Sequence, residues 1–175
     1  HQITLLRGAT GCGKSTQIPQ LILEDSAARG LPCRIICAQP RRLAATALAE
    51  RVASEMGDAT VGGLCGFRIR GEAKVSTQTA LTFVTTGVLL RQLEQDPSLS
   101  SLTHVVVDEV HERSVDVELL LLALRRLLHA ASRGGRIPRI ILMSATVDVT
   151  EFADYFHGTS SCGPKSEIGL CDVPG

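Results

Sequence analysis

The stretch Gly8-Ala9-Thr10-Gly11-Cys12-Gly13-Lys14-Ser15-Thr16 decides the fold of this 175-residue chain. It follows a short apolar run at residues 3–6 and opens onto a segment of helical character from Gln17. The glycines let backbone N–H groups turn inward around an anion, and the N-terminus of the following helix adds the positive end of its dipole. An apolar strand, this loop and a helix are the context that the phosphate-binding pattern requires. The sequence therefore predicts a nucleoside triphosphate site, the alternative being a glycine-rich turn that binds nothing.

Two side chains of this stretch suit the chemistry of a triphosphate. Lys14 supplies a mobile positive charge for the β- and γ-phosphates. Ser15 offers a hydroxyl to Mg²⁺, an ion that keeps several waters and takes phosphate oxygens as ligands. We therefore expect residues 8–16 to hold a nucleotide such as ATP together with Mg²⁺.

Composition places the chain among globular proteins of one domain. Apolar residues make up 44% of the sequence, which argues against overall disorder. No apolar run reaches the ~18 residues needed to span a bilayer, and no signal peptide is visible, so we expect no membrane partner. Lys and Arg total 18, as do Asp and Glu. No overall charge therefore attracts nucleic acid, and any such contact must be local.

The cysteines and the first residue indicate the setting of the chain. Six cysteines occur without any CxxC pair, and one of them lies inside the phosphate-binding stretch. Free thiols in a reducing, intracellular compartment, cytoplasmic or nuclear, are the expected state. The chain does not begin with Met, and we expect it to be a piece of a longer protein.

Short apolar runs alternate with segments of helical spacing along the chain. Strands are expected at residues 3–6, 34–38, 64–70, 81–85, 104–108 and 139–144, with a polar connection at 71–79. Helices are expected after the phosphate loop as far as Gly30, around 43–52 with Pro40 at the first helical position, from Thr86, at 115–129 and at 149–156. Beyond residue 157, only a possible strand near 167–171 is expected. This alternation predicts an α/β fold, with a parallel sheet covered by helices on both faces.

The most distinctive polar residues follow these strands, at the edge of the sheet where ligands of such folds bind. Asp108 and Glu109 come directly after three valines. In a phosphate-loop enzyme, an acid at a strand tip holds Mg²⁺ opposite the Ser15 hydroxyl. A second carboxylate can orient and deprotonate the attacking water. Two adjacent acids on a loop often have no such role, but this position predicts one.

Asp108-Glu109-Val110-His111-Glu112-Arg113 resembles motif II of the DEAH/RHA group of superfamily 2 helicases, with Val110 in place of the usual Ala. Further motifs of the first RecA-like domain of that group are matched in order. These are residues 8–16 (motif I), Gln39-Pro40-Arg41-Arg42 (Ia), Thr85-Thr86-Gly87 (Ib) and Ser144-Ala145-Thr146 (III). Gly66-Phe67-Arg68-Ile69-Arg70 resembles a segment between Ia and Ib, but Gly71-Glu72 stands where an aromatic residue and Glu often follow. The resemblance covers residues 2 to about 157.

This resemblance implies a three-layer RecA-like P-loop NTPase domain at residues 1–157, followed by a tail at 158–175 that leads to a second RecA-like domain. Lys14 would bind phosphate, and Ser15 and Asp108 would hold Mg²⁺ with Glu109 beside them as the catalytic base. His111 would couple the site to the second domain. Ser144 and Thr146 would link hydrolysis to movement.

The resemblance also assigns arginines. Arg51 would stack on the base through a cation–π contact, the alternative being a solvated helix residue. Arg41, Arg42 and Thr86 would contact the backbone of single-stranded RNA, which positions a strand without reading its sequence. For Arg41 and Arg42 the alternative is a solvated helix start. Arg68 and Arg70, on one strand face, extend the RNA track or are solvated.

The sequence thus favours the ATP-binding domain of an ATP-dependent RNA helicase. A piece without the second domain is expected to hydrolyse ATP poorly, because that domain supplies the family's catalytic arginines. A nucleotide-gated RNA clamp or scaffold and a DNA translocase are the alternatives. A small phosphotransferase does not require the motifs Ia, Ib and III, and the preference for RNA over DNA rests on family analogy.

Overall fold

A twisted β-sheet forms the centre of the molecule. The computed structural model describes the chain except for residues 132–136, 147–151, 153–154, 157–167 and 174–175. In the described part, eight strands form one sheet in the order β4-β3-β5-β2-β6-β7-β1-β8. Their bounds are β1 (Ile3–Gly8), β2 (Ile35–Gln39), β3 (Cys65–Ile69), β4 (Glu72–Lys74), β5 (Leu81–Thr85), β6 (His104–Val107), β7 (Arg139–Ser144) and β8 (Ile168–Val173).

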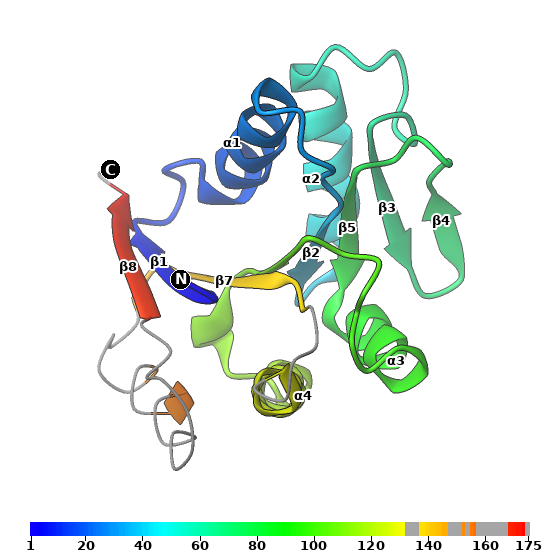
Figure 1. Ribbon diagram of the computed structural model, residues 1–175. Coiled ribbons are helices and arrows are strands. Elements are labelled where there is room, and N and C mark those ends of the chain that lie inside the picture. Colours follow the sequence, from blue (N-terminus) through cyan, green and yellow to red (C-terminus); the bar gives the residue numbers. More distant parts are fainter. Residues whose placement is uncertain (132–136, 147–151, 153–154, 157–167, 174–175) are drawn as a thin grey trace.

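Helices cover both faces of this sheet. Helices α1 (Lys14–Ala28) and α2 (Arg42–Glu55) lie on one face, and α3 (Thr86–Gln95) and α4 (Val115–Ala131) lie on the other (Figure 1). A short 3₁₀ turn, η1 (Val110–Glu112), follows β6. The predicted three-layer α/β architecture is confirmed.

The sheet is parallel except at one edge. All the strand pairings are parallel apart from that of β3 with β4. The sequence analysis missed β4, which lies within the predicted polar connection. Its three residues are all exposed, so they carry no apolar pattern.

The possible strand near residues 167–171 is present as β8, which pairs with β1 along its whole length. Residues 168–173 therefore belong to the sheet, while the division of the chain into a domain at 1–157 and a tail at 158–175 stays a prediction. The role of the tail as a link to a second domain stays a prediction.

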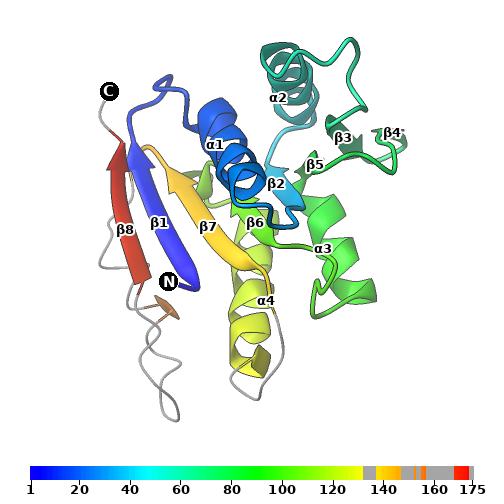
Figure 2. The same ribbon diagram turned by 45° about the horizontal axis from the view of Figure 1, so that its top comes forward.

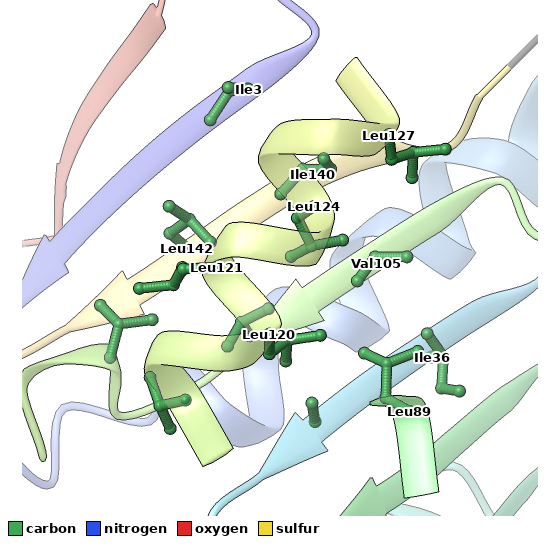
Figure 3. Close-up of a cluster of buried hydrophobic side chains, with 14 of the residues drawn as sticks. Ile3, Ile36, Leu89, Val105, Leu120, Leu121, Leu124, Leu127, Ile140 and Leu142 are labelled. Atoms are coloured by element: carbon green, nitrogen blue, oxygen red, sulfur yellow. The ribbon is translucent and has the colours of Figure 1, made fainter. Parts of the chain in front are cut away.

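Side chains of successive strand residues point to opposite faces, and each face has its own apolar core. Figure 3 shows the core beneath α4, where helix leucines pack on strand residues. It includes Ile36, Val105, Ile140 and Leu142 from the strands and Leu120, Leu121, Leu124 and Leu127 from α4. The core beneath α1 and α2 includes Cys37, Phe67, Phe83, Val106 and Met143 from the strands. Because both faces of the sheet are covered, its central strands β2, β6 and β7 are mostly apolar along their length.

The end of α1 lies where the sequence predicted it, whereas the start of α2 does not. At the end of α1, Gly30 has φ 64° and its N–H donates to the carbonyl of Ala27, so the predicted stop is confirmed. The prediction that Pro40 occupies the first helical position was wrong. Helix α2 begins at Arg42 after an extended Arg41 (φ −113°, ψ 134°), because Gln39 is still held in the sheet.

Two further points concern the remaining helices. Most of the short helix predicted at residues 149–156 lies outside the described residues, although Phe152, Tyr155 and Phe156 are helical. Among the helices of the described part, none combines the length and the apolar character needed to cross a membrane.

Candidate active site

The phosphate loop lies between the end of β1 and the start of α1. Figure 2 shows this loop beyond the arrowheads of β1, β7 and β8. Gly11 and Gly13 have φ values of 82° and 87°, in the left-handed region that favours glycine. Gly13 is the N-cap of α1, and its carbonyl accepts a bond from the Thr16 hydroxyl at 3.1 Å. The loop therefore directs the helix N-terminus and its free N–H groups toward the edge of the sheet.

Lys14 is held against its own loop. Its side chain is buried, and Nζ donates to the carbonyl oxygens of Gly8 at 2.6 Å and Ala9 at 2.8 Å. Because the donor is a charged ammonium group, these hydrogen bonds are stronger than hydrogen bonds between two neutral groups. They fix the charge in the loop, where the sequence predicted a phosphate contact.

Asp108 follows β6 and is buried, with 1% of its surface exposed. Its Oδ1 accepts the N–H of Glu109 at 2.9 Å, and its Oδ2 accepts the side-chain amide of Gln39 at 2.6 Å. The Asp108 N–H donates to the carbonyl of Ala38 in β2, at 3.0 Å. A buried carboxylate of this kind is stable only when its oxygens are hydrogen-bonded. Gln39 of β2 and the N–H of Glu109, just after β6, provide those bonds.

Glu109 projects from a backbone that few residues other than glycine adopt. Its φ is 53°, and Arg113 on the other side of η1 has φ 47°. A left-handed conformation costs an L-residue roughly 1–2 kcal/mol. Such strain is concentrated at functional sites, where it directs a side chain that a relaxed turn would not.

His111 joins Glu109 to the end of β7. Its Nδ1 lies 3.3 Å from Glu109 Oε2 and 3.3 Å from Ser144 Oγ. Ser144 is fully buried, and its Oγ also accepts the N–H of Thr146 at 3.3 Å. Two predicted catalytic residues, Glu109 and His111, therefore form one connected group with the predicted coupling residues Ser144 and Thr146.

Burial raises the pKa of Glu109 above its ordinary value, and the nearby Asp108 carboxylate raises it further. His111 and Lys14 act in the opposite direction and lower the pKa. A carboxylate with a raised pKa accepts a proton more readily, as a general base at neutral pH requires.

The donor atoms beside the loop are suited to Mg²⁺. Ser15 is half-buried at the start of α1, and the Asp108 and Glu109 carboxylates follow β6. Mg²⁺ prefers oxygen ligands and usually takes one or two carboxylates, completing its shell with phosphate oxygens and water. In the described part of the chain, no cluster of three or more His, Cys, Asp or Glu side chains forms a metal site by itself.

Arg51 lies on α2 and is tied to the phosphate-loop helix through Glu55. Arg51 Nε lies 2.8 Å from Glu55 Oε1, and Glu55 Oε2 accepts amide bonds from Gln20 at 2.7 Å and Gln17 at 3.3 Å. The Arg51 guanidinium and the Gln20 amide lower the pKa of Glu55. These contacts link the exposed Arg51 to α1 through Glu55, and its contact with a base stays a prediction.

The predicted RNA-contact residues do not all have the same surroundings. Arg41 pairs with Glu112 of η1 at 3.0 Å, and Arg42 donates to the carbonyl of Arg70 at 3.1 Å, so these arginines gather at the carboxyl edge of the sheet. Arg68 is exposed and lines a hollow of about 320 Å³ with Gln92 of α3.

Thr86 is buried, and its hydroxyl donates to the carbonyl of Gln39 at 3.2 Å. This burial opposes the prediction that the Thr86 side chain contacts RNA directly. The hydroxyl is used inside the protein, where it joins the start of α3 to the end of β2.

A hollow of about 610 Å³ lies at the opposite edge of the sheet, near the start of strands β1, β6 and β7. Its lining includes Gln2, Asp25, Arg29, His104 and Arg139, and none of the phosphate-loop residues. We place the site at the loop, because phosphate binding depends on N–H groups and charge rather than on an enclosed volume.

Comparison with known proteins adds to this geometry. The family model described as DEAD/DEAH box helicase matches residues 2–154. The chain belongs to the DEAD/DEAH box helicase family. The resemblance of its motifs to that family is thereby confirmed, and the phosphate loop, Asp108 and Ser144 all lie within the matched region of this helicase domain.

Several curated helicases are similar to this helicase domain. The DExH-box ATP-dependent RNA helicase DExH1 of Arabidopsis thaliana is 48% identical over 183 residues, covering 99% of the chain. The probable ATP-dependent RNA helicase spindle-E of Anopheles gambiae is 50% identical over 156 residues, and the ATP-dependent RNA helicase dhx29 of Xenopus laevis is 46% identical over 163 residues, each covering 89% of the chain. The chain spans 18%, 10% and 12% of the length of these three relatives.

The sequence analysis of this helicase domain missed three side chains at the site. Gln39 bonds Asp108, Glu55 holds Arg51, and Glu112 pairs with Arg41. Gln39 and Glu112 stand inside recognised motifs, but a motif does not show which of its members touch. Glu55 follows Arg51 by four residues on a helix, and this spacing could have predicted their ion pair.

Proposed function

We propose that this chain is the ATP-binding domain of an ATP-dependent RNA helicase, which couples Mg²⁺-ATP hydrolysis to movement on RNA or to its remodelling. The observation that carries the proposal is the connected group at the sheet edge, in which Glu109, His111 and Ser144 lie next to one another beside the phosphate loop. The names of the similar proteins, all ATP-dependent RNA helicases, support it.

The proposed hydrolysis uses in-line attack by water on the γ-phosphate. The phosphate loop binds the phosphates through its backbone N–H groups, and Lys14 moves its ammonium from the Gly8 and Ala9 carbonyls to a phosphate oxygen. Glu109 accepts the proton of the attacking water. Ser15, Asp108 and Glu109 are the residues that would hold Mg²⁺. When bound, Mg²⁺ supplies positive charge against the phosphate oxygens.

The proposed nucleic-acid contact lies at the same edge of the sheet. Arg41, Arg42 and Arg70 are exposed there, and guanidinium groups bind phosphate oxygens in pairs of hydrogen bonds. Contacts of this kind hold a strand by its backbone and are weakened by salt. Arg41 exchanges its ion pair with Glu112 for a phosphate when RNA binds. Arg68 is the more distant candidate for the same track.

A second RecA-like domain of the same protein is the proposed partner that completes the site. In phosphoryl transfer an arginine finger contributes roughly 10³–10⁵ in rate. We propose that this domain supplies such arginines and contacts His111, and that the 175-residue chain alone hydrolyses ATP slowly. The protein would act inside the cell, in the cytoplasm or the nucleus, where its RNA substrate occurs.

The test is ATP hydrolysis by the complete protein with and without single-stranded RNA. Stimulation by RNA is expected, and Glu109→Gln should lower the rate by roughly 10²–10⁴. Glu94→Gln, at an exposed carboxylate of α3, is the control and should keep the rate. A protein that binds ATP and RNA but hydrolyses no more than its Glu109→Gln variant would instead be a nucleotide-gated clamp. Competition between RNA and DNA of one sequence at several salt concentrations separates the helicase from a DNA translocase.

A further inference from the structure

Gln39 is the last residue of β2, and none of the catalytic roles proposed above involves it. Its side chain is 2% exposed, and its amide nitrogen lies 2.6 Å from Oδ2 of Asp108, itself 1% exposed. Burying polar groups costs free energy unless they are hydrogen-bonded, and here the glutamine amide and the carboxylate bond each other.

The two oxygens of Asp108 are each held by a different element. Oδ1 accepts the N–H of Glu109 and Oδ2 accepts the amide of Gln39. Each carboxylate oxygen has about two acceptor positions, so each keeps one for a metal ion or its water. With one bond on each oxygen, the carboxylate cannot rotate freely.

We propose that Gln39 is a positioning residue that fixes the plane of the Asp108 carboxylate for Mg²⁺. The inference rests on the proposed function, in which Asp108 holds the metal. Partners that orient a metal-binding carboxylate determine how well it binds, although they never touch the metal themselves. Gln39 acts through Asp108 and contacts neither nucleotide nor RNA.

The backbone of Gln39 is fixed by its neighbours. Gln39 pairs with Thr85 of β5, and the residue before it, Ala38, pairs with Val107 of β6. The Thr86 hydroxyl donates to the Gln39 carbonyl at 3.2 Å, which ties α3 to the same residue. Two residues further on, Arg41 pairs with Glu112 of η1. The segment 39–41 therefore contacts the residues after β6 twice. Gln39 bonds Asp108, the proposed Mg²⁺ ligand, and Arg41 pairs with Glu112 beside the proposed RNA track.

Glutamine is the residue type that this position requires. An asparagine is one methylene shorter and does not span the same gap. A glutamate of the same length puts a second negative charge against Asp108 and has no proton to donate when ionised. A methionine has a similar length but lacks the donor. These differences supply the variants for the test.

The experiment measures binding of a fluorescent ATP analogue by the complete protein as a function of Mg²⁺ concentration. In Gln39→Met, the Mg²⁺ concentration for half-maximal tight binding should rise by roughly 10-fold. Binding of the same analogue in EDTA should change less than about twofold, since the phosphate loop is untouched. Gln39→Glu keeps the side-chain volume and should show the same loss, which provides a second test if the methionine variant does not fold.

Two controls separate positioning from a general loss of stability. Thr79→Val removes a buried hydroxyl that donates to the Gly63 carbonyl at 2.8 Å, far from motif II in the sequence, and should leave the Mg²⁺ dependence unchanged. In an Asp108→Asn background, Gln39→Met should have no further effect, since residues that act through one another are not additive. A folded Gln39 variant with the Mg²⁺ dependence of the wild type would overturn the inference. A wild-type protein without nucleotide binding would overturn the proposed function itself.

Discussion

His111 Nδ1 lies 3.3 Å from the Glu109 carboxylate. The same nitrogen lies 3.3 Å from the hydroxyl of Ser144 at the end of β7. One imidazole therefore joins the proposed catalytic base to a neighbouring strand that leads toward Thr146. A change in the position of this ring therefore alters its contacts with both groups.

The first prediction concerns the pH dependence of ATP hydrolysis by the complete protein. The raised pKa of Glu109 means that its carboxylate takes up a proton at a higher pH than the ordinary value of 4.5. A protonated carboxyl cannot act as a base, so kcat should fall as the pH falls through this raised pKa. His111 lowers that pKa, and the acid limb of the profile in His111→Ala should therefore move to higher pH. An acid limb that stays in place would separate His111 from Glu109.

The second prediction concerns Lys14. Lys14→Met keeps the aliphatic stem but removes the ammonium that donates to Gly8 and Ala9. Charge-assisted hydrogen bonds contribute about 1.5–3 kcal/mol, so nucleotide affinity should fall roughly 10–100-fold. Titration with a fluorescent nucleotide measures this loss. Lys74→Met, at an exposed lysine of β4, is the matched control, and an equal loss there would contradict the assignment.

The third prediction concerns Arg51 and the base. Arg51→Ala should weaken binding of ATP by about 2–30-fold, as expected for a cation–π contact of about 0.5–2 kcal/mol. Inorganic tripolyphosphate has no base, and its affinity should not change. Competition of the two ligands against a fluorescent nucleotide measures both. Arg29→Ala, at the far end of α1, is the control, and a loss of tripolyphosphate affinity in Arg51→Ala would assign Arg51 to phosphate instead.

The fourth prediction concerns the core beneath α4. Leu124 is fully buried and points from α4 toward the strands (Figure 3), whereas Leu122 on the same helix is 40% exposed. Leu124→Ala should lower the free energy of unfolding by about 2–5 kcal/mol, because it leaves a cavity. Leu122→Ala should have a clearly smaller effect. Urea unfolding of both variants measures the difference, and equal losses would contradict the packing described for α4.

Local patterns predicted most elements of this fold. The apolar runs at β2, β5, β6 and β7 and the helical spacing of α4 are confirmed, because both faces of the sheet are buried and leave continuous apolar runs. Strand β4 was not predicted, since an exposed edge strand of three residues needs no apolar pattern. Pro40 was placed in a helix that begins at Arg42, because the sheet contact that delays the helix lies outside the local sequence.

The sequence by itself determined the phosphate loop, the acidic pair after β6 and the family to which the chain belongs, because each depends on residue types at fixed spacing. Only the tertiary structure decided which of these residues meet. Adjacency of β2 and β6 puts Gln39 against Asp108, and packing of α1 on α2 lets Gln20 bond Glu55, which pairs with Arg51. The order of strands depends on hydrogen bonds between segments far apart in the chain, which no local period encodes.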